Sequence, residues 1–268
     1  MFKREFIVLK LRKGIRLESL GLPFKKALVR AAEMGADAVE INARTEIRPA
    51  DLSRTGVRQI KKLLTDYQLS VCCVNFPSRR GYSTIEDLEQ RVDATKDTMT
   101  MAWDLGCQVV SNRIGKIPSG ESPAHPHLIQ ALEDLGRHSS HTGTVFAART
   151  GDDEGAVLAD LIKSLSPGAL QIDFDPAELM LNRHEVQPAM DCLADNVAYF
   201  RARDAVRDLS RSDTVEVPLG RGSVDLPPLL AKLEEKNYLG YISVQCPASP
   251  DAALQMGQAL EYLTHIFG

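Results

Sequence analysis

Short apolar runs rich in β-branched residues alternate with longer amphipathic stretches along the whole chain of 268 residues. Short apolar runs bounded by turn residues predict buried strands, and apolar positions that recur every three or four residues predict helices. The pattern predicts strands at residues 6–11, 37–42, 69–76, 107–114, 143–150, 169–175, 197–204 and 241–246. A helical pattern follows each of them, and the last covers residues 250–266.

Strict alternation of strands and helices predicts parallel strand pairing with right-handed crossovers. Eight such units match a single-domain α/β fold, the (β/α)8 TIM barrel, over residues 1–268, because such barrels typically need about 250 residues. The alternative is an open doubly wound sheet, but the sequence lacks a glycine-rich phosphate-binding turn after the first strand. We expect longer loops after the fourth and seventh strands, at residues 115–122 and 205–224.

Composition and charge narrow the class of protein. Apolar residues make up 44% and charged residues 25%, which is ordinary for a soluble globular protein. The net charge of −4 gives no general attraction to nucleic acid or to anionic lipid. No apolar run approaches the roughly 20 residues that span a bilayer, and the five cysteines show no metal-binding or redox spacing. We therefore expect a cytoplasmic protein with a small-molecule partner, while a homo-oligomer stays open.

Polar side chains gather where the predicted strands end, which is the end that carries the active site in a TIM barrel. Alternation of side chains along each strand places these residues inside the mouth: Glu40, Asn42, Asn75, Asn112, Arg149, Asp173, Asp175, Arg201, Arg203 and Gln245. The loops beyond add Arg44, Arg79, Arg80, Arg113, Glu178, His184, Asp204 and Arg221. Arginine suits bidentate contact with phosphate or carboxylate. With fewer acidic residues there, a locally positive mouth predicts a small anionic ligand.

Five segments carry a family resemblance. They are AAEMGADAVEI (31–41), AWDLGCQVVSNRIG (102–115), DFDPAEL (173–179), RARDAVRD (201–208) and PLGRGSVDLPPLLAKLEEKNYLGYISVQ (218–245). In this order they resemble the xylose isomerase-like superfamily, in particular its sugar phosphate isomerase/epimerase group. The resemblance implies a divalent metal held by Glu, Asp, His and Glu at the ends of strands 5, 6, 7 and 8. The matching positions are Arg149, Asp175, Arg201 and Gln245, so Asp175 is the only retained family ligand.

The charges at these four positions disfavour a metal. Three carboxylates would bring about −3 to a dication, whereas Asp175 and the two arginines sum to about +1. Arginine stays protonated and cannot be a ligand. We therefore expect no cofactor, with a divalent metal disfavoured, and we expect Asp175 to accept a hydrogen bond from Arg149 or Arg201 instead.

Three functions stay open at this point. The first is an enzyme for a small anionic sugar or sugar acid that works without metal. In it, Arg149 and Arg201 would stabilise an enediolate oxyanion, and Glu40, Asp175 or Glu178 would move the proton. Substrate contacts would come from Arg44, Asn75, Arg79, Asn112, Arg113, Arg203, Arg221 and Gln245.

The second function is a non-catalytic relative that binds an anionic metabolite or serves as a partner subunit. The third is a metal-dependent isomerase with displaced ligands at Asp173, Asp175, Glu178 and His184, although all four come from one strand and its loop. Two structural interpretations compete with these roles. Glu40 could pair with Arg44 or Arg149, and Asp173, one layer deeper than Asp175, could pair with Arg203 or Arg149.

Overall fold

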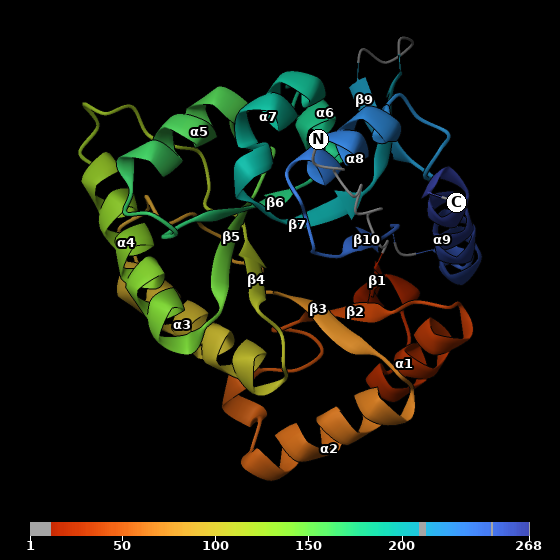
Figure 1. Cartoon of the computed structure of the whole chain (residues 1–268). Coiled ribbons are helices and arrows are strands. Elements are labelled where there is room, and N and C mark those ends of the chain that lie inside the picture. Colours follow the sequence, from red (N-terminus) through yellow and green to blue (C-terminus); the bar gives the residue numbers. More distant parts are fainter. Residues whose placement is uncertain (1–11, 209–212, 248, 268) are drawn as a thin grey trace, which may run out of the picture.

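The structure, a computed structural model, describes residues 12–208, 213–247 and 249–267. Eight parallel strands close into a barrel in the order β1-β10-β7-β6-β5-β4-β3-β2 (Figure 1). They are β1 (Lys13–Arg16), β2 (Ala38–Asn42), β3 (Ser70–Asn75), β4 (Val109–Asn112), β5 (Val145–Arg149), β6 (Gln171–Phe174), β7 (Val197–Ala202) and β10 (Ile242–Val244). The predicted TIM barrel is confirmed.

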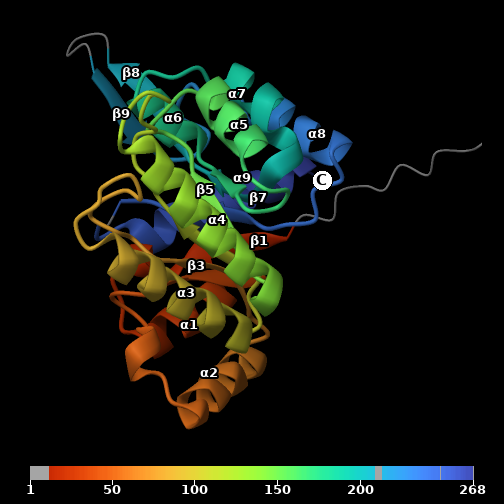
Figure 2. The ribbon, with the colours of Figure 1, turned by 90° about the vertical axis from the view of Figure 1, so that its left-hand side faces the viewer.

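Helices surround the barrel, with their apolar faces packed on the outside of the strands (Figures 1 and 2). They are α1 (Phe24–Glu33), α2 (Arg54–Asp66), α3 (Leu88–Asp104), α4 (His125–Thr142), α5 (Gly155–Ser164), α6 (Pro176–Leu181), α7 (Val186–Leu193), α8 (Leu226–Glu235) and α9 (Ala252–Phe267). Short 3-10 turns lie at Leu17–Leu20, Pro49–Asp51 and Ala194–Asn196. Within the described residues, we find no helix with the length and hydropathy that crossing a bilayer requires.

The first barrel strand differs from the prediction. The predicted strand at residues 6–11 lies outside the described residues, and the barrel is closed by β1, which pairs with both β10 and β2. The strand reads Lys-Gly-Ile-Arg, so it has no apolar run that a hydropathy pattern could detect. Its glycine is required by packing, because a Cβ at Gly14 would lie 2.8 Å from Sγ of Cys72.

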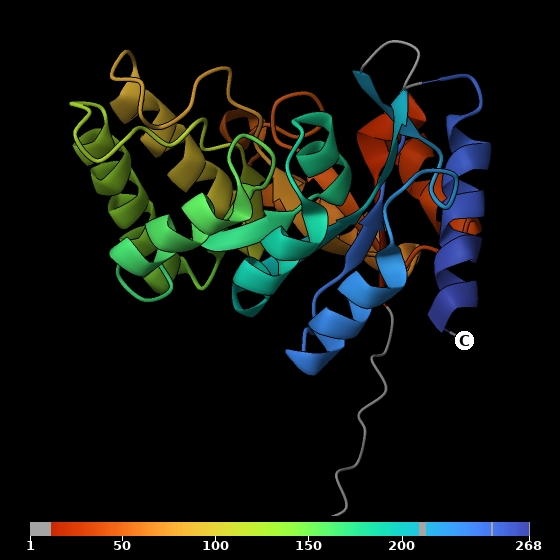
Figure 3. The same ribbon diagram turned by 90° about the horizontal axis from the view of Figure 1, so that it is seen from above.

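A hairpin replaces most of the loop expected after the seventh strand. The predicted strand at 197–204 ends at Ala202, and β8 (Asp204–Asp208) then pairs antiparallel with β9 (Asp213–Val217). Figure 3 shows this hairpin projecting beyond the end of β7, beside α9. The hairpin therefore extends the wall of the barrel at the end where the strands finish.

Apolar and polar side chains divide between the two faces of the barrel wall. The main apolar core lies between strands and helices, where the rings of Phe174 and Phe200 stack with centroids 5.8 Å apart. Inside the barrel, Glu40, Asp173 and Arg201 are completely buried. Burying charges is costly unless they are paired, so these three residues mark the first place to look for a site.

Candidate functional site at the barrel mouth

Arg201, near the end of β7, links three strands across the barrel. Its Nε lies 2.9 Å from each carboxylate oxygen of Asp173, on β6. Its Nη1 donates to Oε2 of Glu40, on β2, at 2.7 Å, and to Oε1 of Gln245, just after β10, at 2.9 Å. Burial alone would lower the pKa of this guanidinium, but Asp173 and Glu40 raise it well above its ordinary value. A fixed positive charge therefore occupies the centre of the barrel.

Asp173 is shared between two arginines. Oδ2 also accepts from Nε of Arg149 at 3.3 Å and from the hydroxyl of Ser111. Burial favours the neutral acid, but the charges of Arg201 and Arg149 outweigh it and hold the pKa of Asp173 below its usual value. The structural pairing predicted for Asp173 is thus found, with Arg149 and Arg201 as its partners and not Arg203.

Arg149 is the arginine of this group that reaches the mouth. Its side chain keeps 10% of its surface exposed, whereas that of Arg201 keeps 1%. Nη2 donates to Oδ1 of Asn75 at 3.0 Å, and within the described chain Nη1 makes no hydrogen bond. Burial and the nearby charge of Arg201 lower the pKa of Arg149. One edge of this guanidinium is therefore available to an acceptor.

Glu40 anchors the other side of Arg201. Its Oε2 also accepts from the phenol of Tyr199 at 3.0 Å, and Nε of Arg16 lies 3.7 Å from Oε1. Glu40 therefore pairs with Arg201 and Arg16, and not with Arg44 or Arg149 as predicted. Oε1 of Glu40 and Nη2 of Arg201 are buried, and neither has a hydrogen-bond partner in the described part of the chain. Unmet buried polar atoms are costly, so both mark positions where a further polar group would be stabilising.

A second ion-pair group lies around Arg203, one layer nearer the mouth. Nη1 of Arg203 donates to Asp175 at 2.6 Å and to Glu178 at 3.0 Å. Its Nε donates to Oε1 of Glu216 at 3.1 Å, and its Nη2 donates to Oε2 of Glu216 at 2.6 Å. The prediction that Asp175 pairs with Arg149 or Arg201 is therefore wrong. Asp175 is the N-cap of α6, where it accepts the backbone N–H of Glu178 at 3.1 Å. This places its carboxylate above Asp173, level with Arg203.

Acidic groups outnumber arginines in this second group. Arg113 donates to Asp152 at 3.1 Å and to Glu178, so it shares the Glu178 carboxylate with Arg203. Burial would raise the pKa of Glu178, but the two arginines hold it below its usual value. Two arginines thus meet four carboxylates, those of Asp152, Asp175, Glu178 and Glu216. The expectation of fewer acids than arginines at the mouth is wrong here, since Asp152 and Glu216 were not assigned to it.

Two predicted asparagines shape the loops at the mouth. Asn42 accepts the backbone N–H of Arg44 at 2.8 Å. Asn112 accepts the backbone N–H of Arg113 at 2.8 Å and donates to the phenol of Tyr82 at 2.9 Å. Their side chains are buried in these contacts, so they support the site without offering a free polar group to a ligand.

The loop arginines are mostly engaged or solvent-facing. Arg44 is exposed, with its guanidinium 4.3 Å from the ring centroid of Phe76. Arg79 and Arg221 are exposed, and Arg80 pairs with exposed Glu86. Of the remaining predicted residues, Asp204 uses its carboxylate on backbone N–H groups, and His184 is half-buried in the loop after α6.

Three charged residues at the ends of β1 and β2 were not predicted. Glu18 accepts from Arg16 and, at 2.9 Å, from Nδ2 of Asn42, while Glu46 accepts the backbone N–H of Asn42 at 2.7 Å. Burial, with the charges of Glu18 and Glu40 nearby, raises the pKa of Glu46 to about 7. Arg16 was missed because the first strand was expected at residues 6–11. No sequence signal separates Glu46 from an ordinary loop acid.

The residues present do not fit a divalent metal. In the described part of the chain, no three side chains of His, Cys, Asp or Glu come together in a way that could hold one. Asp173 and Asp175 are each bound by arginine, and the guanidiniums of Arg149 and Arg201 lie where the family resemblance implies ligands. A dication here would have to break these ion pairs and lie beside two positive charges, which Coulomb repulsion opposes. The displaced set does not converge either, since Asp173 pairs with different arginines from Asp175 and Glu178.

Known structures share this architecture. A xylose isomerase domain protein from Planctomyces limnophilus is 21% identical, with a TM-score of 0.83 over 96% of this chain and 97% of that one. D-allulose 3-epimerase from Methylomonas sp., in complex with D-allulose, is 16% identical, with a TM-score of 0.76 over 95% and 96%. A xylose isomerase-like TIM barrel protein from Mycobacterium smegmatis, in complex with magnesium, is 14% identical, with a TM-score of 0.77 over 96% of both chains. At these identities the likeness establishes the fold.

The sequence comparisons give the family. No curated protein matches the chain. Residues 28–266 match the family model described as the xylose isomerase-like TIM barrel. Because this match covers most of the chain and the barrel is closed as that description requires, the protein belongs to the xylose isomerase-like TIM barrel family.

Proposed function

We propose that this protein is of the sugar isomerase/epimerase type, that it takes a small anionic sugar or sugar acid at the barrel mouth, and that it works without a divalent metal. One observation carries the proposal. The buried guanidinium of Arg201 is held between Asp173 and Glu40 at a strand end where the family resemblance implies a metal ligand. A fixed organic cation thus stands in the region of the expected metal charge.

Arg149 supports the anionic character of the ligand. Its Nη1 is without a protein partner among the described residues, and its side chain keeps some exposure to the mouth. A carboxylate, a phosphate oxygen or a developing enediolate oxyanion would complete its hydrogen bonds, and charge-assisted hydrogen bonds of this kind are strong. Arg201 is fully buried and paired, so its part is to hold Asp173 and Glu40 in place.

A sugar ligand is supported by the comparisons. Among the similar structures, the Methylomonas enzyme is bound to D-allulose, and 3-keto-D-glucoside 4-epimerase from E. coli is 16% identical with a TM-score of 0.74. The extension of a sugar-like ligand to this chain is part of the proposal. In its catalytic form, an acid of the barrel interior moves a proton of the sugar. Of the three predicted acids, Glu40 suits this best, because its Oε1 is still without a hydrogen-bond donor.

A specific observation favours a second candidate, a non-catalytic binder. Asp175 and Glu178 are both held by Arg203, and the pKa of Glu178 is kept low, so Glu178 is not prepared to take a proton at neutral pH. A protein that moves no proton can still bind an anion through Arg149. The two candidates share the binding step and differ only in turnover.

The test is calorimetric titration with a panel of sugar phosphates and sugar acids, with a chelator present throughout. We expect binding that weakens as salt is raised, because screening acts over about 8–10 Å at physiological ionic strength. Arg149→Gln should abolish most of the affinity, and the matched control Arg80→Gln should leave it unchanged, because Arg80 is an exposed loop residue paired with Glu86. Failure of the folded wild type to bind any member of the panel at low salt would refute the proposal.

Turnover is measured separately on whichever ligand binds. Incorporation of solvent deuterium at a sugar carbon, followed by nuclear magnetic resonance in chelator, reports proton removal whether or not the product accumulates. Incorporation that is lost in Glu40→Gln supports the enzyme. Binding without incorporation supports the non-catalytic candidate.

A further inference from the structure

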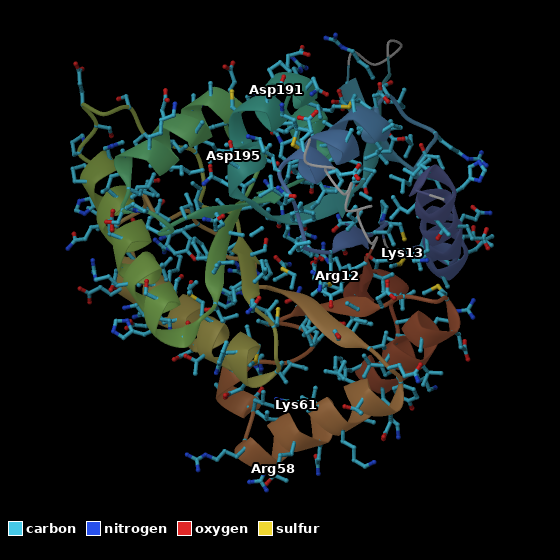
Figure 4. The ribbon with its side chains drawn as sticks, in the orientation of Figure 1. Arg12, Lys13, Arg58, Lys61, Asp191 and Asp195 are labelled. Carbon is cyan, nitrogen blue, oxygen red and sulfur yellow. The ribbon has the colours of Figure 1, made fainter. Side chains whose placement is uncertain are left out.

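A cavity lies beside the candidate site, between the β8–β9 hairpin and helix α9. Its volume is about 210 Å³, and its lining comes from β9 and the loop after it, from the segment after β10 and from α9. Figure 3 shows the hairpin and α9 next to each other at the mouth end of the barrel. A larger hollow of about 970 Å³ is at the opposite end, where Figure 4 labels its lining residues Arg12, Lys61 and Asp195.

Two lining residues of the smaller cavity belong to the ion-pair groups of the mouth. Gln245 accepts a hydrogen bond from Nη1 of Arg201 at 2.9 Å. Glu216 accepts from Nε and Nη2 of Arg203 at 3.1 and 2.6 Å. The cavity therefore shares part of its wall with the candidate site.

The lining of this cavity favours an uncharged group. Its apolar members are Val217, Pro218, Leu219, Pro247 and Ala259. Hydrogen-bonding groups come from Gln245, Ser249 and Gln255. No lysine, arginine or histidine is among the described residues that line it, and both oxygens of its one carboxylate, Glu216, are bound by Arg203. An anion would find no charged partner there, whereas an apolar group would be removed from water.

The cavity has room for one ring and is smaller than the pocket of a whole ligand. Pockets for drug-sized molecules measure about 300–1,000 Å³, whereas about 150 Å³ is enough to hold benzene. Arg149, the proposed anion contact, is on β5, three strands from β10 around the barrel. A ligand held by its anion at Arg149 would thus reach the cavity with a substituent that extends across the mouth.

We propose that the cavity between the hairpin and α9 binds an uncharged, ring-sized substituent of the anionic ligand, which makes the ligand a glycoside of a sugar acid. This inference rests on the function proposed for the mouth, because Arg149 holds the anion in both. Even one methylene in an apolar pocket changes affinity by about 10–200-fold. A ring that fills the cavity should therefore strengthen binding at least about tenfold.

The test is calorimetric titration at low salt with glucuronic and galacturonic acids, each beside its phenyl and benzyl glycosides. We expect the wild type to bind the best glycoside at least about tenfold more tightly than the free acid. Ala259→Leu adds bulk to the cavity wall, so this variant should bind the acid and its glycosides with similar affinity. The matched control Ala253→Leu makes the same change on α9 outside the cavity lining and should keep the preference.

Val217→Phe fills the cavity from the hairpin side and replaces Ala259→Leu if that variant does not fold. Glycosides that bind the wild type no better than their acids, or not at all, would overturn this inference alone, provided that other sugar acids or sugar phosphates bind. A preference that persists in a folded filling variant would overturn it as well. Failure of the folded wild type to bind any of these ligands would overturn both this inference and the proposed function.

Discussion

Arg201 illustrates how one side chain can organise the interior of a barrel. Its Nε and Nη1 bind two buried carboxylates and an amide, whereas Nη2 has no hydrogen-bond partner among the described residues. A buried ion pair contributes little net stability when compared with apolar packing, but removing one partner leaves the other charge uncompensated. Removing Arg201 is therefore expected to cost more stability than the ion pairs contribute in the intact protein.

Arg201→Gln should lower the free energy of unfolding by about 3–5 kcal/mol at pH 7, the usual cost of an orphaned buried charge. Arg201 and Arg149 depress the pKa of Asp173 in the folded protein, so its contribution to stability is present at neutral pH and is lost as pH falls through the folded pKa. In the variant, Asp173 takes up a proton more readily because one of its two arginines is gone. The difference in free energy of unfolding between variant and wild type should therefore become smaller toward pH 4. Urea unfolding at a series of pH values measures it. A gap that stays constant would show that Arg201 acts through packing alone.

Glu46 should show the opposite dependence. Burial and neighbouring acids raise its pKa to about 7, so the folded protein holds its proton more tightly than the unfolded chain does. The stabilisation that comes from the bound proton is complete below the unfolded pKa, near 4.3, and is lost as pH rises toward 7. Glu46→Gln should thus match the wild type near pH 4 and exceed it by about 1–3 kcal/mol at pH 8.

Glu18→Gln is the matched control for this measurement. Burial would raise the pKa of Glu18, but the hydrogen bond from Asn42 and the charge of Arg16 outweigh it and lower the pKa. Its replacement should therefore reduce stability at neutral pH. If both variants changed stability in the same direction at pH 8, the assignment of a raised pKa to Glu46 would be wrong.

At the scale of elements, β7 determines the layers of the site. Tyr199 and Arg201 lie on the strand, and Arg203 follows just after its end. Their side chains reach Glu40, Asp173 and Asp175, respectively. The hairpin that follows adds Glu216 to the top layer. One strand and its continuation thus connect the deep polar interior with the rim of the mouth.

Asp204 fixes the start of the hairpin and the loop that returns from it. Its carboxylate accepts the backbone N–H groups of Ala205, Gly220, Gly222 and Val224 at 2.9, 3.1, 2.7 and 3.0 Å. Asp204→Ala should speed amide hydrogen exchange in residues 213–224 and cost at least about 2 kcal/mol, because hydrogen bonds to a charged group contribute about 1.5–3 kcal/mol each. Asp204→Asn, which keeps one acceptor, should have a smaller effect. Unchanged exchange in the alanine variant would contradict this role.

Much of the barrel could be predicted because its strands are apolar runs, and seven of the eight were expected within about two residues of where they lie. The first was not, because Lys-Gly-Ile-Arg has one apolar residue and its place is set by pairing with β10 and β2. Strand alternation also predicted which residues point inward. Strand alternation could not predict the ion-pair partners of these residues. A guanidinium can reach across several strands, and which carboxylate it meets depends on how deep in the barrel each residue lies. Asp175 was therefore assigned to Arg149 or Arg201 when its place as a helix cap sets it beside Arg203.

For the whole molecule, the two ends of the barrel have different chemistry. At the mouth, ion pairs surround the guanidinium of Arg149, which keeps part of its surface exposed, while a hollow of about 970 Å³ at the opposite end is lined by both charged and apolar residues. A ligand of the mouth that binds only the folded state should raise the free energy of unfolding, by about 2.7 kcal/mol at a ligand concentration of 100 times Kd. The melting temperature should therefore rise as the ligand concentration is raised. We expect this shift from a bound sugar acid to be the same with and without chelator. It should be absent in Arg149→Gln.

Manganese titration, with free ion followed by electron paramagnetic resonance, measures most directly whether arginines have replaced the metal. Wild-type protein and Asp175→Asn are titrated side by side at equal concentration, because Asp175 is the one family ligand position that keeps its residue. We predict that both leave the manganese free in solution, since Asp173 and Asp175 are already bound by guanidinium groups. One equivalent of manganese bound by the wild type and lost in Asp175→Asn would contradict the metal-free proposal.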